Sequence, residues 1–221
     1  MTDARHLIET IRNELKPVEE AIVGHRYLEA LRTGHVPQQA FRIFAGQQYH
    51  IIASDLRSIA LLVARHDNLV SRPYLLGLLQ GENTAFETLA KFGRALGMSD
   101  TDLRSSEPIP SAFAYSAFVA WLGLYGSDAE LAAAFTANFA AWGANCGQMG
   151  SALKTQYGIK SDAVAFFDLF ANLAAVDGTA LAVIQHGLDR GVPPILLERA
   201  ACLMQGYELM FWDSMAEAAG V

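Results

Sequence analysis

The 221-residue sequence has few cysteines, few charged residues and no long uncharged apolar run. Its two cysteines, Cys146 and Cys202, are too few for a disulfide framework, which favours a reduced, cytoplasmic protein. Charged residues make up only 18% of the chain, yet no apolar run of about 18 residues is free of charge. A transmembrane span is therefore not expected. The N-terminal stretch MTDARHLIETIRNELK carries acids and is unlike a signal peptide.

Positive charge is scarce as well, because 16 Lys and Arg residues stand against 23 Asp and Glu residues, for a net charge of −7. Nucleic acids and anionic membranes are bound by basic patches. We therefore expect neither a nucleic-acid partner nor a membrane partner. The hydrophobic fraction of 52% favours extensive burial and a sizeable interface between subunits.

Strand patterns are almost absent. Apolar residues instead recur with the helical period of 3.6 between short Gly and Pro turns. The pattern predicts helices over residues 2–15, 18–33, 37–65, 73–97, 111–125, 128–157, 161–189 and 195–218. No linker, repeat or low-complexity tract interrupts them. The sequence therefore predicts an all-α bundle of seven to eight helices that forms one domain over residues 1–221.

Several common catalytic motifs are missing too. The chain has no Ser–His–Asp pattern, no Gly-rich phosphate loop and no CxxC motif. Its six histidines fall near helix ends or off the main apolar faces, so none pairs with an acid in a metal-binding pattern. The sequence therefore supports no nucleophilic triad, no phosphate loop and no zinc site.

Carboxylates are present where they are least expected, on the apolar faces of four predicted helices. These residues are Asp55, Glu82, Asp177 and Glu208, and Gln48 and Tyr115 lie on similar faces. In the stretch GYELMFWDSMA (residues 206–216), for example, aromatic and methionine side chains lie within about 40° of Glu208 around the helix. One buried acid is usually structural, but four favour a polar internal cavity. Their repulsion would require a proton, a cation or a cationic ligand.

Three segments, in order along the chain, resemble the TenA family (thiaminase II). They are HRYLEALRTGHVPQQAF with the later QQY (residues 25–41 and 47–49), PSAFAY (110–115) and YELMFWD (207–213). The resemblance covers nearly the whole chain. It implies the heme-oxygenase-like helical bundle that TenA, PqqC and a set of di-metal oxidases share. It also implies a homo-oligomer, either a homodimer or a homotetramer.

The resemblance implies only part of the family's catalytic set. TenA enzymes hydrolyse aminopyrimidine compounds from thiamin breakdown, and their catalytic Glu matches Glu208 while a pyrimidine-binding Tyr matches Tyr115. The family's Asp falls on Gln48, and its cysteine nucleophile falls on Ala140. Its remaining tyrosine positions fall near Ile51, Ala144 and Phe170. Covalent catalysis cannot start from alanine, so hydrolysis of the thiaminase type is not expected.

The first hypothesis is a TenA-like protein of thiamin-related salvage that binds a small nitrogen-containing ligand, pyrimidine-like or amine-like, without a cofactor. The predicted ligand-binding residues are Gln48, Asp55, Glu82, Tyr115, Phe170, Asp177 and Glu208. Glu208 is also the candidate catalytic group. The pocket would be acidic and aromatic, which suits a neutral or cationic heterocycle.

Two alternatives remain. In a heme-oxygenase-like metal-dependent oxidase, a divalent metal would be held by carboxylates, with Glu82 and Asp177 as the candidate ligands. That resemblance lacks every histidine, because Leu89, Leu173 and Ala180 stand at the histidine positions. First-row metals favour imidazole, so a tight di-iron site is not expected. The other alternative is a non-catalytic relative that binds a ligand or a protein partner.

Overall fold

The computed structural model describes residues 3–173 and 178–221, and all regular structure in these residues is helical. The helices are α1 (Ala4–Val23), α2 (Arg26–Arg32), α3 (Gln38–Arg65), α4 (Ser71–Ala95), α5 (Asp100–Arg104), α6 (Pro110–Tyr125), α7 (Asp128–Thr155), α8 (Ala165–Ala171), α9 (Gly178–Asp189) and α10 (Pro194–Ala219). Seven of them have 12 residues or more. The all-α prediction is confirmed. None of the described helices has the combined length and apolar content needed to cross a membrane.

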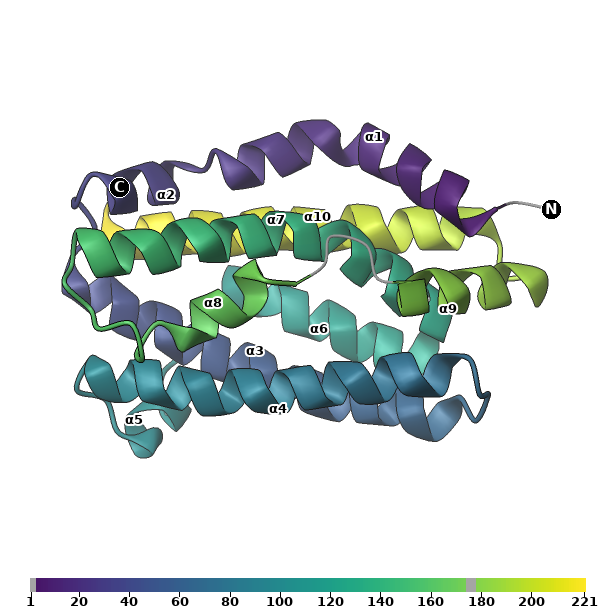
Figure 1. Cartoon of the computed structure of the whole chain (residues 1–221), viewed down its shortest axis with the longest axis horizontal. Coiled ribbons are helices and arrows are strands. Elements are labelled where there is room, and N and C mark those ends of the chain that lie inside the picture. The colour runs from purple at the N-terminus through teal and green to yellow at the C-terminus, as the bar shows by residue number, and fades with distance from the viewer. Residues whose placement is uncertain (1–2, 174–177) are drawn as a thin grey trace.

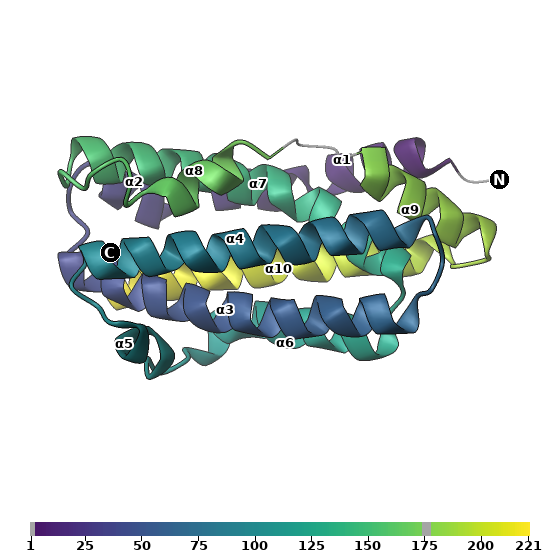
Figure 2. The same cartoon turned by 60° about the horizontal axis from the view of Figure 1, so that its bottom comes forward.

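The long helices form a ring around a central space. Going around it, α7 contacts α10, α10 contacts α6, α6 contacts α3, and α3 contacts α4. The short helices α8 and α9 lie between α4 and α7 and close the ring (Figures 1 and 2). Helix α1 lies outside the ring and covers α7 and α10. This arrangement lets side chains from six helices reach one interior space.

Helix α1 differs from the prediction, which placed a break near Pro17. The structure has one helix through Pro17, and α1 bows away from α7 and α10 near its middle (Figure 1). Leu7 and Ile11 before the proline and Ile22 after it are all buried. Burial on both sides holds the helix together, although proline removes one backbone hydrogen bond.

The helix predicted over residues 161–189 is also wrong, because the structure has two shorter helices, α8 and α9, in this region. At the end of α8 the side-chain amide of Asn172 donates to the carbonyl oxygen of Asp168 at 2.6 Å. An Asn side chain that bonds the last turn in this way satisfies a terminal carbonyl group. The periodicity of apolar residues continues across this boundary, so it gave no sign of the break.

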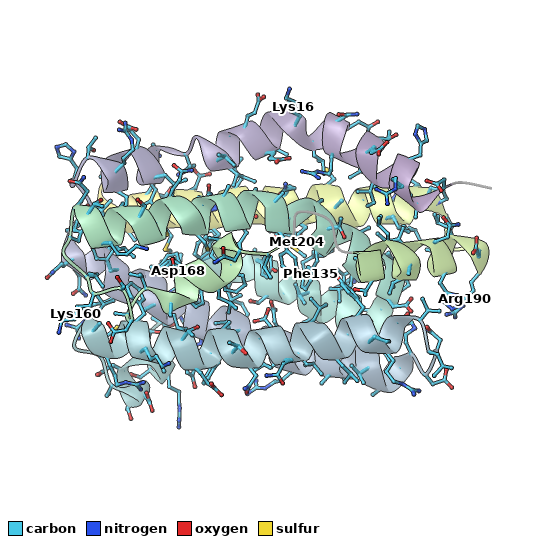
Figure 3. The ribbon with its side chains drawn as sticks, viewed as in Figure 1. Lys16, Phe135, Lys160, Asp168, Arg190 and Met204 are labelled. Carbon is cyan, nitrogen blue, oxygen red and sulfur yellow. The ribbon has the colours of Figure 1, made fainter. Side chains whose placement is uncertain are left out.

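The apolar core consists of two buried clusters. The first contains Phe44 and Trp212, and the second contains Phe135 and Met204. In Figure 3, Phe135 and Met204 lie among the helices, whereas Lys16 and Lys160 point to solvent. Residues from both clusters line the cavity described next, so the polar site separates two apolar regions.

Candidate functional site

An internal cavity lies between α3, α4, α6, α7, α8 and α10. About 40 Å³ of it is open to the centre of a water-sized sphere, whereas one water needs about 10–15 Å³ by the same measure. The cavity therefore has room for a few water molecules beside its polar side chains.

The cavity wall is half apolar and half polar. Its apolar members are Ile51, Ile52, Phe139, Trp142, Phe170 and Phe211, and its polar members are Gln48, Asp55, Glu82, Tyr115, Asn138 and Glu208. Three of the twelve are carboxyl groups, and no Lys, Arg or His is found among the described residues of the wall. Such a wall favours flat apolar ligands that carry hydrogen-bond donors or positive charge.

Glu208 sits on α10 with only 3% of its surface exposed. Its Oε1 accepts a hydrogen bond from Trp212 Nε1 at 3.1 Å, and its Oε2 accepts one from Asn138 Nδ2 on α7. Burial raises the pKa of Glu208 to about 8, although these two hydrogen bonds oppose the shift. At neutral pH the carboxyl group therefore holds a proton, which it can donate to a ligand nitrogen.

Asp55 on α3 and Glu82 on α4 form a second acidic group in the same cavity. Burial, and after it the charge of Glu82, raises the pKa of Asp55 well above its usual range. Burial also raises the pKa of Glu82 to about 7. Asp55 is 1% exposed, and its Oδ1 has no hydrogen-bond partner among the described residues. An unpaired buried oxygen of this kind is costly unless something else satisfies it.

Tyr115 on α6 lines the same cavity as the two acidic groups. Burial raises the pKa of its hydroxyl group well above the usual value, and the charges of Asp55, Glu82 and Glu208 add to the shift. The hydroxyl group therefore keeps its proton at any physiological pH. It is available as a hydrogen-bond donor, either to a carboxylate or to a ligand.

Close contacts between helices position these side chains. A Cβ atom on Gly143 of α7 would lie 2.9 Å from the carbonyl oxygen of Phe170, so only glycine lets α8 bring Phe170 this near. At the start of α6, the Gln47 amide accepts from Ile109 N at 2.8 Å and donates to Glu107 O at 3.0 Å. This clamp fixes the beginning of the helix that carries Tyr115.

The structure brings six of the seven predicted ligand-binding residues to this one cavity: Gln48, Asp55, Glu82, Tyr115, Phe170 and Glu208. The seventh, Asp177, lies outside the described residues. Whether the acids share a cavity was left open by the sequence, and three of the four do. Their roles in binding stay a prediction.

Counting along the chain placed the family's nucleophile position at Ala140, and this assignment stays a prediction. The α7 side chains that line the cavity are Asn138, Phe139 and Trp142. Asn138 and Trp142 are four residues apart and share a helix face, whereas Ala140 is about 200° from Asn138. The residue that faces Glu208 from α7 is thus an amide. Cys146 is buried further along α7, where burial and the charge of Glu208 raise its pKa, so its reactive thiolate form is disfavoured.

The sequence analysis did not name five of the residues that line the cavity: Ile52, Asn138, Phe139, Trp142 and Phe211. It noted Ile51 only because a tyrosine position of the family falls near it. Aromatic and aliphatic residues on apolar faces cannot be told from core by pattern alone. Asn138 did carry a signal, because it is an amide in the mainly apolar run AAAFTANFAAW (residues 132–142). An amide inside such a run calls for a buried polar partner.

A metal centre finds little support in the part of the chain that the structure describes. There, no group of three or more His, Cys, Asp or Glu side chains is arranged to hold a metal ion. The oxidase alternative relied on Glu82 together with Asp177, and only Glu82 is described. Two carboxylates without imidazole give a weak first-row metal site.

Comparison with known proteins identifies the family of this chain. The profile of the TENA/THI-4/PQQC family matches residues 12–167. An uncharacterized protein of Haemophilus influenzae is 23% identical over 130 residues, which are 59% of this chain and 60% of that protein. The chain therefore matches less than two thirds of this relative's length.

Solved structures share the fold at low identity. A TenA homolog from Pseudomonas syringae pv. tomato has a TM-score of 0.81 at 15% identity, over 95% of this chain and 92% of its own. A candidate TenA-like thiaminase from Sulfolobus solfataricus has a TM-score of 0.71 at 16% identity, over 96% of each chain. Heme oxygenase-1 from Synechocystis, solved with heme, has a TM-score of 0.69 at 14% identity, over 97% of this chain and 92% of its own. The fold is thus the heme-oxygenase-like helical bundle, and the chain belongs to the TENA/THI-4/PQQC family.

Proposed function

We propose that this protein binds a small nitrogen-containing ring, of the pyrimidine or amine type, in the cavity between α3 and α10. The observation that carries the proposal is a cavity with aromatic walls that holds three carboxyl groups and no basic side chain among its described residues. A ligand with N–H donors or a protonated nitrogen complements this wall. Anionic ligands are disfavoured by the same charges.

Glu208 is the main polar contact in the proposal. Asn138 and Trp212 hold its carboxyl group in place, which lowers the entropic cost of meeting a ligand nitrogen. Gln48 adds an amide that can donate or accept, while Trp142 and Phe170 supply faces for stacking. With Asn138 opposite Glu208, the site offers acid–base chemistry and binding rather than a covalent cysteine step. The family membership favours a role in thiamin-related salvage, and no metal is needed.

Native mass spectrometry of the purified protein, with a denatured control and elemental analysis, tests this proposal. We expect a released organic molecule of a few hundred daltons at most, rich in nitrogen, and no stoichiometric metal. If the protein is purified empty, titration with 4-aminopyrimidine and with benzoate is expected to show binding of the base only. Stoichiometric iron or manganese, or preference for benzoate, would contradict the proposal.

We also propose that the outer face of α6 and α10 joins two copies of this chain. Helix α6 has no charged residue in its 16 positions, although part of its surface is exposed. The exposed apolar residues of the two helices are Phe113, Trp121, Leu124, Tyr125, Ile195, Leu203 and Met210. From full surfaces of about 150–250 Å² for large side chains, they expose roughly 700 Å².

This face suits a second copy in both area and charge. A typical monomer has an apolar patch of at most about 600 Å², and a standard interface covers about 800 Å² per partner. The uncharged α6 can face its own copy without like-charge repulsion, although each chain carries a net charge of −7. A two-fold interface built on this face would also hold α6, and with it Tyr115, against the cavity.

The substitution Trp121→Glu tests this interface, because it places a charge in the face and removes an aromatic side chain that is 49% exposed. By size-exclusion chromatography with light scattering, we expect the unmodified protein to be a dimer or larger and the variant to be a monomer. The matched control is Leu69→Glu, in a loop residue that is 77% exposed and outside the face. An unmodified protein that is monomeric at about 100 µM would refute the interface.

A further inference from the structure

A second pocket lies outside the central cavity between α3 and α10. Helix α5 packs beside one end of the α3–α4 pair (Figures 1 and 2), and the pocket lies between these three helices. The lining of this α5 pocket includes Tyr49, Phe86, Leu89, Asp100, Leu103 and Arg104. About 110 Å³ of it is open to the centre of a water-sized sphere, against about 40 Å³ of the central cavity. One water needs about 10–15 Å³ by this measure, so the pocket holds several waters that a small molecule can displace.

The inner wall of the α5 pocket is apolar. Tyr49 on α3 and Phe86 on α4 line it as a tilted pair, with 5.2 Å between their ring centroids. Leu89 and Leu103 add aliphatic surface, and both are buried. Aromatic and aliphatic side chains grouped in this way bind the apolar body of a small molecule.

The outer rim of the α5 pocket carries one acid and one base. Asp100 and Arg104 are the first and last residues of α5, and both line the pocket. They are four residues apart, so they share one side of the helix with a rise of about 6 Å between them. Asp100 pairs with Arg94 at 3.8 Å, but both side chains are exposed and such a pair is weak. Arg104 forms no ion pair with any residue that the structure describes, so both charges are available to a ligand.

Close packing fixes α5, so the walls of the pocket are preformed. Leu103 is 2% exposed, and a Cβ atom on Gly93 of α4 would lie 3.0 Å from its Cδ1. At the start of α5, Ser99 N donates to Asp102 Oδ2 at 2.7 Å, and Asp102 N donates to Ser99 Oγ at 3.1 Å. After its end, Ser106 Oγ donates to Leu103 O at 2.7 Å. A pocket with fixed walls loses little conformational entropy when a ligand binds.

We propose that the α5 pocket binds a small zwitterion with an aromatic side chain, of the amino-acid class. Arg104 pairs with the carboxylate of this ligand and Asp100 with its ammonium group, while its ring lies against Tyr49 and Phe86. A simple anion is disfavoured by Asp100, and a simple cation is disfavoured by Arg104. The central cavity offers three carboxyl groups and no basic side chain among its described residues, so the two sites select different ligands.

Three probes of similar shape and different charge test the site by isothermal titration calorimetry at about pH 6. They are L-phenylalanine, its amide, which lacks the carboxylate, and 3-phenylpropionate, which lacks the ammonium group. We expect the unmodified protein to bind L-phenylalanine at least about fivefold more tightly than either analogue. Its affinity should not change in the presence of 4-aminopyrimidine, because the α5 pocket lies outside the central cavity.

Two substitutions at the rim assign the contacts. In Arg104→Gln, the preference for L-phenylalanine over its amide should disappear, through a loss of affinity for L-phenylalanine of about fivefold or more. In Asp100→Asn, the preference over 3-phenylpropionate should disappear in the same way. Both side chains are exposed, so the fold should survive. The matched control Arg57→Gln removes an exposed charge from α3, outside the pocket, and should bind like the unmodified protein.

Three outcomes would overturn the site. The first is no binding of L-phenylalanine at about 10 mM. The second is a preference over the two analogues that survives both Arg104→Gln and Asp100→Asn. The third is displacement of L-phenylalanine by 4-aminopyrimidine, which would place it in the central cavity. The proposed function stands in the first two cases, because it concerns the central cavity alone.

Discussion

Replacing Glu208 by glutamine is expected to lower the affinity for 4-aminopyrimidine by roughly 10- to 100-fold, which corresponds to the loss of one charge-assisted hydrogen bond. The reason is that the carboxyl group, with its pKa raised to about 8, can share a proton with a ring nitrogen, whereas an amide cannot. Gln keeps the shape, and its single amide oxygen can still accept from Trp212, while its NH2 group can donate to the Asn138 oxygen once that amide turns over. The fold should therefore survive the change.

Calorimetric titration of the Glu208→Gln variant provides the measurement. The matched control is Glu217→Gln, in which an exposed glutamate of the same helix, not part of the cavity wall, loses its charge. We expect this control to bind like the unmodified protein. Unchanged affinity in Glu208→Gln would mean that the ligand does not contact this carboxyl group, and the proposed site would have to be abandoned.

The second large effect is a loss of stability with rising pH. The pKa of Glu208 is about 8 in the folded chain and 4.5 in the reference state, and that of Glu82 is about 7 against 4.5. Both folded values are raised, so the stability these groups contribute is fully present below about pH 4.5 and is lost as the pH rises through about 7 and 8. For Glu208 alone the loss is on the order of 3–5 kcal/mol in the free energy of unfolding.

Urea unfolding of the ligand-free protein between pH 6.5 and 8.5 measures the upper part of this loss, which is about 2 kcal/mol for Glu208. Below that window His66 acts in the opposite direction, because burial lowers its pKa and its protonation then favours unfolding. In Glu208→Gln the slope with pH should become shallower, and at pH 8.5 the variant should be more stable than the unmodified protein. Stability that is constant or rising over this range would show that the acids are paired or solvated instead.

These two predictions describe opposite effects of the same side chains on ligand binding and on stability. The same buried acids that destabilise the empty protein supply the contacts that a basic ligand needs. Binding that satisfies Glu208, or the pair of Asp55 and Glu82, should recover stability in proportion to affinity and concentration. Binding sites often combine function with a local cost in stability in this way.

The predictions from sequence failed where contacts between distant segments decide the structure. The break expected at Pro17 is absent because Ile11 and Ile22 are both buried on the same helix. Asn138, which donates to Glu208 from α7, was not singled out, because counting along the chain does not show which face of α7 meets α10. Sequence spacing gives the relative rotation of residues within one helix but not the rotation of that helix against its neighbours.

By itself, the sequence determined that the chain is helical and that Asp55, Glu82 and Glu208 lie on apolar faces, because the 3.6-residue period fixes those faces without reference to any other helix. The resemblance of its ordered segments also pointed to the family that the profile match established. Only the tertiary structure decided that these acids share one cavity, that Asn138 and Trp212 hold Glu208, and that Asp55 Oδ1 has no hydrogen-bond partner in the described chain. The physical reason is that the rotation and the offset of packed helices depend on side-chain contacts between segments far apart in the chain.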